Sequence, residues 1–261
     1  MGVAAAGNTR SVSSPPVSQR IRRVARDSFG WSALRAGQEE VIAAVLGGRD
    51  ALAVMATGYG KSALYQIAGV LIDGPTVVVS PLIALQRDQV SDLRDGDVGG
   101  AAAVSSAVKA SERRDALEDA CQDELEFLFV TPEQFGNPDV MAQITAARPS
   151  LFVVDEAHCI AEWGHDFRPA YLRLGAVVEQ LGRPTVLALT ATAAPHVRDE
   201  IVQRLRMRDP LVQVCGFDRQ TIHLAVERFH DEHSKRRAIV ERVRDADGSG
   251  IVYAATRKAV E

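Results

Sequence analysis

Cysteine is scarce in this sequence of 261 residues, which contains three of them and no C-x-x-C pair. Cys121, Cys159 and Cys215 are far apart along the chain. An odd number of widely spaced cysteines argues against a disulfide framework, and the absence of paired cysteines argues against a structural zinc site. This cysteine usage fits a reducing compartment, so we expect the protein in the cytoplasm.

Long apolar runs are also missing, because no stretch approaches the roughly 20 residues that a membrane span needs. The first residues lack the charged start and apolar core of a secretory signal. Residues 1–18 are rich in Ser, Pro and small residues, which predicts a disordered leader. The net charge of −4 does not suggest a dedicated DNA-binding domain, but a local basic surface would suffice to bind nucleic acid.

Short apolar runs alternate with amphipathic segments along most of the chain. This alternation predicts an α/β fold, a parallel sheet with helices on both faces, over residues 19–214. The expected strands are residues 51–55, 76–80, 101–104, 126–130, 151–155 and 185–190. The expected helices are residues 38–46, 61–72, 82–94, 111–122, 138–147, 169–181 and 194–206. In such sheets ligands bind at the carboxyl ends of the strands.

A second pattern starts near residue 215. Residues 215–261 read as a connector, a strand at 221–229, a helix near 234–244 and a strand at 250–258. We interpret this segment as the incomplete start of a second α/β domain.

The sequence ATGYGKS follows the first expected strand and precedes a helix. Gly58 and Gly60 allow a tight turn whose N–H groups face a phosphate, and the helix N-terminus favours the same anion. Lys61 can reach the β- and γ-phosphates of a nucleotide, and the Ser62 hydroxyl can bind Mg²⁺. Met55 stands where the strict phosphate-loop pattern has its first Gly, so an incidental glycine-rich turn is the alternative.

The sequence DEAH follows the apolar run 151–154, so Asp155 is expected at a strand end. There Asp155 would hold Mg²⁺ while Glu156 orients and deprotonates the attacking water, with His158 in the same nucleotide site. A zinc site of His158, Cys159 and His165 has poor ligand spacing. A Cys159–His158 nucleophilic pair is also disfavoured, because sequence neighbours cannot easily form the required geometry.

With these two motifs in place, the sequence resembles superfamily 2 helicases, and more narrowly the RecQ family of DNA helicases, from about Phe29 to its end. The resemblance implies RecA-like domains, ATP and Mg²⁺ as cofactors, and single-stranded DNA and duplex junctions as partners.

FGWSALRAGQ (residues 29–38) resembles the family's adenine-recognition motif. Trp31 and Arg35 would sandwich the base and Gln38 would read it. The nucleotide-binding residues carried over from the family are Trp31, Arg35, Gln38, Thr57, Gly58, Tyr59, Gly60, Lys61 and Ser62. The family usually has Pro at Ala56 and Gly at Tyr59.

Three further motifs match the family: SPLIALQRDQV (80–90), TPEQF (131–135) and ALTATA (188–193). In relatives the first two grip DNA and the third couples it to the ATP state. The family commonly has Arg at Gln134, which puts one phosphate contact in doubt. The residues carried over are Ser80, Pro81, Gln89, Thr131, Thr190 and Thr192.

CIAEWGHDFRPAY (159–171) resembles the aromatic-rich loop that senses single-stranded DNA in RecQ relatives. Trp163 and Phe167 could stack on bases, at roughly 1–3 kcal/mol each. Arg168 could meet a phosphate, while His165 and Asp166 could relay the loop's position to the nucleotide site.

The resemblance implies an ATP-dependent 3′→5′ DNA helicase acting in repair and recombination. FDRQTI (217–222) resembles the entry to the second motor domain, and Arg257 comes too early to be its arginine finger. We therefore expect this chain alone to bind ATP and Mg²⁺ but to hydrolyse ATP slowly. Two alternatives remain open: an ATP- or DNA-binding module without turnover, and a phosphate-loop NTPase unrelated to DNA.

Overall fold

The structure is a computed structural model, which describes residues 15–96, 98–122, 124–161, 168–215, 223, 225–254 and 256. The chain divides into two compact units, residues 1–217 and 218–261. Each unit is described by itself below.

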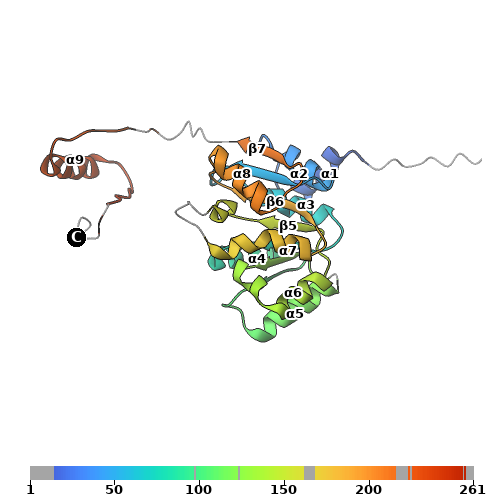
Figure 1. Ribbon diagram of the computed structural model, residues 1–261. Helices are drawn as coiled ribbons and strands as arrows, with labels where there is room; N and C mark the ends of the chain where they lie inside the picture. The colour runs from blue at the N-terminus through green and yellow to red at the C-terminus, as the bar shows by residue number, and fades with distance from the viewer. Residues whose placement is uncertain are drawn as a thin grey trace, which may run out of the picture. The chain divides into compact units, whose positions relative to one another are not determined.

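The first unit is built on a seven-stranded sheet in the order β3-β4-β2-β5-β6-β1-β7. Every pair of neighbouring strands is parallel. Helices lie on both sides of this sheet (Figure 1), so the predicted α/β fold is confirmed. The strands are β1 (Ala51–Met55), β2 (Thr76–Val79), β3 (Ala101–Val104), β4 (Phe127–Val130), β5 (Leu151–Val154), β6 (Thr185–Thr190) and β7 (Leu211–Cys215). The last of these, β7, was not predicted.

Burial on both faces explains why the strands are apolar throughout. All five residues of β1 are buried, and they alternate between two cores. Leu52 and Val54 pack on one side of the sheet, while Ala53 and Met55 pack on the other. This alternation follows from the two-residue period of a strand, and a strand covered on both faces is mostly apolar.

Each core is closed by its own set of helices. One face carries α1 (Val17–Asp27), α2 (Gln38–Leu46), α3 (Ser62–Leu71) and α4 (Ile83–Asp95). The other carries α5 (Ala110–Cys121), α6 (Pro138–Ala146), α7 (Leu174–Gln180) and α8 (Pro195–Arg204). Three 3₁₀ turns complete the first unit's described helices: η1 (Pro132–Gly136), η2 (Ala157–Ile160) and η3 (Pro169–Arg173).

Two predicted boundaries were wrong. Helix α1 begins at Val17, so the last two residues assigned to the disordered leader are helical, with Ile21 of the same helix buried in the core. The single helix expected over residues 169–181 is split into η3 and α7. The Tyr171 hydroxyl is bonded in the core, and the tighter 3₁₀ turn carries that side chain inward before the α-helix starts.

The second unit contains α9 (Glu232–Asp245), whose start is capped by Asp231 accepting from the Ser234 N–H at 2.8 Å. The helix predicted near 234–244 is therefore confirmed. Residues 225–229 and 250–254, expected in strands, are not in strands. Among the described helices of the chain, none is long and apolar enough to cross a membrane.

Candidate nucleotide-binding site

The predicted nucleotide residues follow three strands that are neighbours in the sheet. The phosphate loop follows β1, the DEAH sequence follows β5, and β6 lies between them. Because all three strands are parallel, their carboxyl ends lie at one edge of the sheet. The structure therefore brings together segments that are about a hundred residues apart in the sequence, which is where open parallel sheets bind ligands.

The phosphate loop turns tightly at its two glycines. Gly58 and Gly60 have φ of 78° and 81°, a left-handed conformation that other residues rarely adopt. Lys61 ends the loop and its Nζ donates to the Met55 carbonyl at 3.1 Å. The ammonium group is thus folded over the loop, at the start of α3, where a phosphate would meet both its charge and the helix N-terminus.

Gln38 links the predicted adenine-recognition segment to this loop. Its Nε2 donates to the carbonyls of Tyr59 at 3.1 Å and Gly60 at 3.0 Å. Its Oε1 accepts from the Arg35 N–H at 2.8 Å, and the side chain is buried at 3% exposure. A buried carboxamide bonded on both ends is rigidly placed, so the residue predicted to read the base also fixes the loop that would hold the phosphates.

Trp31 and Arg35, the predicted base sandwich, have other ring partners in the structure. Trp31 stacks on Phe29, with ring centroids 4.6 Å apart. Arg35 lies over the Tyr59 ring at 5.5 Å and donates to the Gly58 carbonyl. The Tyr59 hydroxyl donates to the Ala36 carbonyl at 3.1 Å. Tyr59, which departs from the family pattern, thus joins the two segments, and the sandwich stays a prediction.

Asp155 stands just beyond β5 and is 8% exposed. Its Oδ1 accepts from the Glu156 N–H at 3.0 Å. Burial and then the neighbouring Glu156 charge raise the pKa of Asp155 to about 6, against the opposing effects of that N–H bond, Lys61 and His158. Because burial destabilises the charge of this carboxylate, a cation bound beside it would be stabilising.

Glu156 has φ of 49°, a left-handed backbone that turns the chain sharply into η2. Its carboxylate lies 3.2 Å from His158 Nδ1, and this contact lowers the pKa of Glu156. Contacts with Cys159 and then with Glu156 raise the pKa of His158 to about 10. Glu156 is therefore ionised at neutral pH, the state a group that accepts a proton from water must have.

His158 also ties β5 to β6. Its Nδ1 lies 2.9 Å from the Thr190 Oγ1. The Thr190 hydroxyl donates to the Thr192 carbonyl at 3.0 Å, so its oxygen is left to accept from the imidazole N–H. A displacement at the end of either strand would move the end of the other through this hydroxyl.

The residues present fit Mg²⁺ bound with a nucleotide phosphate. Ser62 Oγ and the Asp155 carboxylate are hard oxygen ligands, and Mg²⁺ commonly takes one or two protein ligands while phosphate and water supply the rest. Among the described residues, no three His, Cys, Asp or Glu side chains could hold a metal ion together. His158 and Cys159, two residues of the disfavoured zinc alternative, lie with Nε2 and Sγ 4.0 Å apart, and Cys159 is buried.

Several residues assigned to DNA contact are buried. Ser80 is 0%, Thr131 4% and Gln89 8% exposed, whereas Pro81 is half-buried. Gln89 Nε2 points to Ser62 Oγ at 3.4 Å, toward the nucleotide side. Their DNA-binding role stays a prediction.

Arg168 closes the base of the predicted DNA-sensing loop. Its N–H donates to the Cys159 carbonyl at 3.0 Å, and its guanidinium to the Pro81 carbonyl at 3.4 Å. Residues 162–167 lie outside the described part of the chain, so the predictions for Trp163, His165, Asp166 and Phe167 fall there too.

Tyr171 belongs to the site but had been given no role. Its ring is fully buried and its hydroxyl donates to the Asp155 carbonyl at 2.9 Å. Burial raises the pKa of Tyr171, so the group stays a donor. The hydroxyl of a buried tyrosine usually has a hydrogen-bond partner. A tyrosine at the end of the aromatic-rich motif (residues 159–171) was therefore the sequence signal that could have identified this contact.

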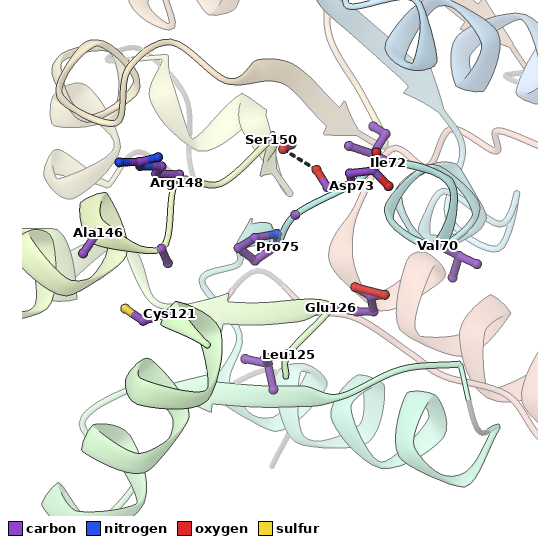
Figure 2. A pocket seen from close by; sticks show the side chains of 12 residues that line it. Val70, Ile72, Asp73, Pro75, Cys121, Leu125, Glu126, Ala146, Arg148 and Ser150 are labelled. Carbon is purple, nitrogen blue, oxygen red and sulfur yellow. Dashed lines mark hydrogen bonds between the residues drawn. The ribbon is translucent and has the colours of Figure 1, made fainter. Parts of the chain in front are cut away.

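A cavity of about 740 Å³ lies elsewhere, at the amino ends of β2, β4 and β5 (Figure 2). Pro75, Glu126 and Ser150 directly precede those strands and line it, with Cys121 and Arg148. This edge is opposite the phosphate loop, so the cavity is not the candidate site.

Comparison with known proteins fits this geometry. A family model described as DEAD/DEAH box helicase matches residues 35–201. The probable ATP-dependent DNA helicase RecS of Bacillus subtilis (strain 168) is 38% identical over 92% of this chain and 48% of its own length. The ATP-dependent DNA helicase RecQ of Pasteurella multocida (strain Pm70) is 37% identical over 94% of this chain and 38% of its own. The chain thus spans about half, or less, of these relatives' lengths.

Solved structures share the fold. The DUF1998 helicase MrfA aligns with a TM-score of 0.66 at 17% identity, over 93% of this chain and 39% of that one. The Pyrococcus furiosus Hef helicase domain aligns with a TM-score of 0.54 at 20% identity, over 72% of this chain and 39% of that one. The chain therefore belongs to the DEAD/DEAH box helicase family, within which its sequence is similar to the RecQ proteins.

Proposed function

We propose that the chain carries the ATP-binding motor of a RecQ-type DNA helicase, which hydrolyses ATP in response to single-stranded DNA and moves 3′→5′ to unwind duplexes. The observation that carries the ATP site is the shared edge of the sheet, where the phosphate loop after β1 faces the acids after β5 with Thr190 of β6 between. DNA as the substrate is supported by the relatives' names, ATP-dependent DNA helicases.

In this proposal each group at the edge has one task. Lys61 exchanges its bond to the Met55 carbonyl for the phosphates of ATP. Ser62 and Asp155 hold Mg²⁺, which neutralises charge on the phosphates when bound. Glu156, ionised at neutral pH, orients the attacking water and takes its proton.

Coupling to DNA would run through the segment that follows the acids. Trp163 and Phe167 stack on bases, and His165 and Asp166 relay the loop's position. Arg168 is bonded to the Pro81 carbonyl, so displacing the loop base also disturbs the neighbouring DNA motif. Tyr171 and His158 then connect this region to Asp155 and Thr190.

A role in DNA repair or recombination is part of the proposal, because it belongs to the RecQ resemblance. We also place the protein in the cytoplasm, since Cys121, Cys159 and Cys215 are all free thiols.

Two titrations on this chain test the proposal. A fluorescent ATP analogue should bind with Mg²⁺ present, and a labelled single-stranded oligonucleotide should bind more tightly in low salt, because phosphate contacts release counterions. Trp163→Ala should weaken oligonucleotide binding by about 1–3 kcal/mol per lost stacked base and leave the nucleotide affinity unchanged.

The outcomes separate the alternatives. Nucleotide binding without any oligonucleotide binding would favour a phosphate-loop NTPase unrelated to DNA. Oligonucleotide binding that Trp163→Ala leaves intact would remove the DNA-sensing role from the loop. Failure to bind nucleotide would reject the whole proposal.

A further inference from the structure

Gln89 was assigned to DNA contact, yet the structure places it against the nucleotide site. It lies on the buried side of α4 and is 8% exposed. Its Nε2 donates to Ser62 Oγ at 3.4 Å. Ser62 is the first residue of α3, on the same face of the sheet as α4. The carboxamide therefore reaches from a helix of the DNA motif to the hydroxyl that we propose binds Mg²⁺.

Packing alone does not explain an amide at this position. Gln89 Oε1 is buried and has no hydrogen-bond partner among the described residues. A leucine of similar size would fill the space without burying an unpaired oxygen. Gln86, one turn earlier on α4, also has a buried Oε1 with no partner among the described residues, but its Nε2 donates to the Ser80 carbonyl at 2.8 Å, a main-chain contact that fixes the β2–α4 turn. The two amides thus differ in what their Nε2 contacts, because only that of Gln89 reaches a side-chain hydroxyl.

We propose that Gln89 is a positioning residue whose carboxamide orients the Ser62 hydroxyl for Mg²⁺, so that nucleotide affinity depends on Mg²⁺ through a residue of α4. The inference rests on the proposed function, since it concerns the same ATP site. A serine hydroxyl rotates freely unless a partner holds it. An N–H donated to Ser62 Oγ occupies one lone pair of this oxygen, so the other would be available to a cation.

The placement would also let DNA binding at α4 change the contact between Gln89 and Ser62. Ser80 and Pro81 lie just before this helix and belong to the predicted DNA motif. A shift of α4 that moved Gln89 away from Ser62 would loosen the Mg²⁺ ligand, and a shift toward it would tighten the contact. The nucleotide site and the DNA motif would then share one side chain.

The test measures Mg²⁺ dependence and not activity. A fluorescent ATP analogue is titrated into the 261-residue chain, once with Mg²⁺ and once with EDTA. The dissociation constant in EDTA is divided by that in Mg²⁺, and this ratio is compared between variants. Gln89→Leu should reduce this ratio by about threefold to tenfold, the size of one hydrogen bond, while the affinity in EDTA stays unchanged. Gln86→Leu, which removes a buried amide from the same helix, should leave the ratio unchanged.

A second arm uses Ser62→Ala. This variant should lose most of the Mg²⁺ effect, and adding Gln89→Leu to it should change the ratio no further, because the two residues act through one contact. If Gln89→Leu does not fold, Gln89→Asn, whose amide is too short to reach Ser62, should show the same reduced ratio.

Two results would overturn the proposal. One is an unchanged ratio in Gln89→Leu or Gln89→Asn. The other is a loss of single-stranded oligonucleotide affinity without change in the ratio, which would return Gln89 to DNA contact. A wild-type chain that binds no nucleotide would reject the proposed function itself, and this failure is distinguishable because it appears before any variant is compared.

Discussion

The two edges of the sheet differ in what they offer a ligand. At the amino edge, a cavity of about 740 Å³ is lined by Cys121, Glu126 and Arg148 among others. At the carboxyl edge the described loops are bonded to one another. Gln38 donates to the carbonyls of Tyr59 and Gly60, and Lys61 donates to the carbonyl at the end of β1.

We expect the chemistry of this molecule at the carboxyl edge and not at the cavity. The carboxyl edge has two acids with shifted pKa values, the buried Asp155 and the half-buried Glu156, and Glu156 has a left-handed backbone. Perturbed acids, a cation and a helix N-terminus at one place are the signature of a functional site. The loop contacts that occupy the space are the ones a nucleotide would replace.

The largest expected effect comes from removing a cation at one edge or at the other. Lys61→Ala removes the ammonium group of the phosphate loop and should weaken binding of a fluorescent ATP analogue by about 2–5 kcal/mol, as the loss of a charge paired with phosphate does. Arg148→Ala removes a cation that lines the large cavity and should leave the affinity unchanged.

Equal losses from both variants would contradict the comparison, since nucleotide would then be bound by overall charge. A loss confined to Arg148→Ala would move the nucleotide site to the amino edge.

A second prediction concerns the stability of the ligand-free protein. The pKa of Asp155 is raised from 3.8 to about 6, so between these pH values the folded protein binds more protons than the unfolded one. Stability therefore falls as pH rises through this window, and the full penalty, about 2–3 kcal/mol, is present above pH 6. Asp155→Asn removes the penalty and should raise the melting temperature at pH 7.5.

The stabilisation should shrink as the pH is lowered below about 6, because wild-type Asp155 is then also neutral. Asp88→Asn, an exposed acid on α4, should show no such change. Thermal melts at both pH values measure the effect, and a destabilised Asp155→Asn variant at pH 7.5 would show that the carboxylate stabilises the fold.

Much of this edge could be predicted from the sequence, because its signals are local. Five-residue and four-residue apolar runs located β1 and β5, and parallel pairing then required that Lys61 and Asp155 meet at one edge. The strand β7 was missed because Gln213 interrupts its apolar run, a polar position that this partly exposed strand accommodates.

What could not be predicted depends on side chains far apart in sequence. Ser62 and Gln89 are 27 positions apart and no local pattern links them, so only the packing of α4 beside α3 makes them neighbours. The bond from Tyr171 to the Asp155 carbonyl arises because a 3₁₀ turn replaces the expected helix start. Tertiary contacts such as these override local patterns.

The smallest expected effect tests whether Gln38 reads the base or only braces the loop. Its Nε2 now holds the Tyr59 and Gly60 carbonyls. If Gln38 also binds adenine, Gln38→Ala should reduce the preference for ATP over GTP by about tenfold, the equivalent of one or two hydrogen bonds. Competition of each nucleotide against a fluorescent analogue gives this ratio, with Glu40→Ala, an exposed change on α2, as the control. Equal weakening of ATP and GTP would instead mean that Gln38 acts on the phosphate loop alone, because a brace lost from the loop affects every nucleotide alike.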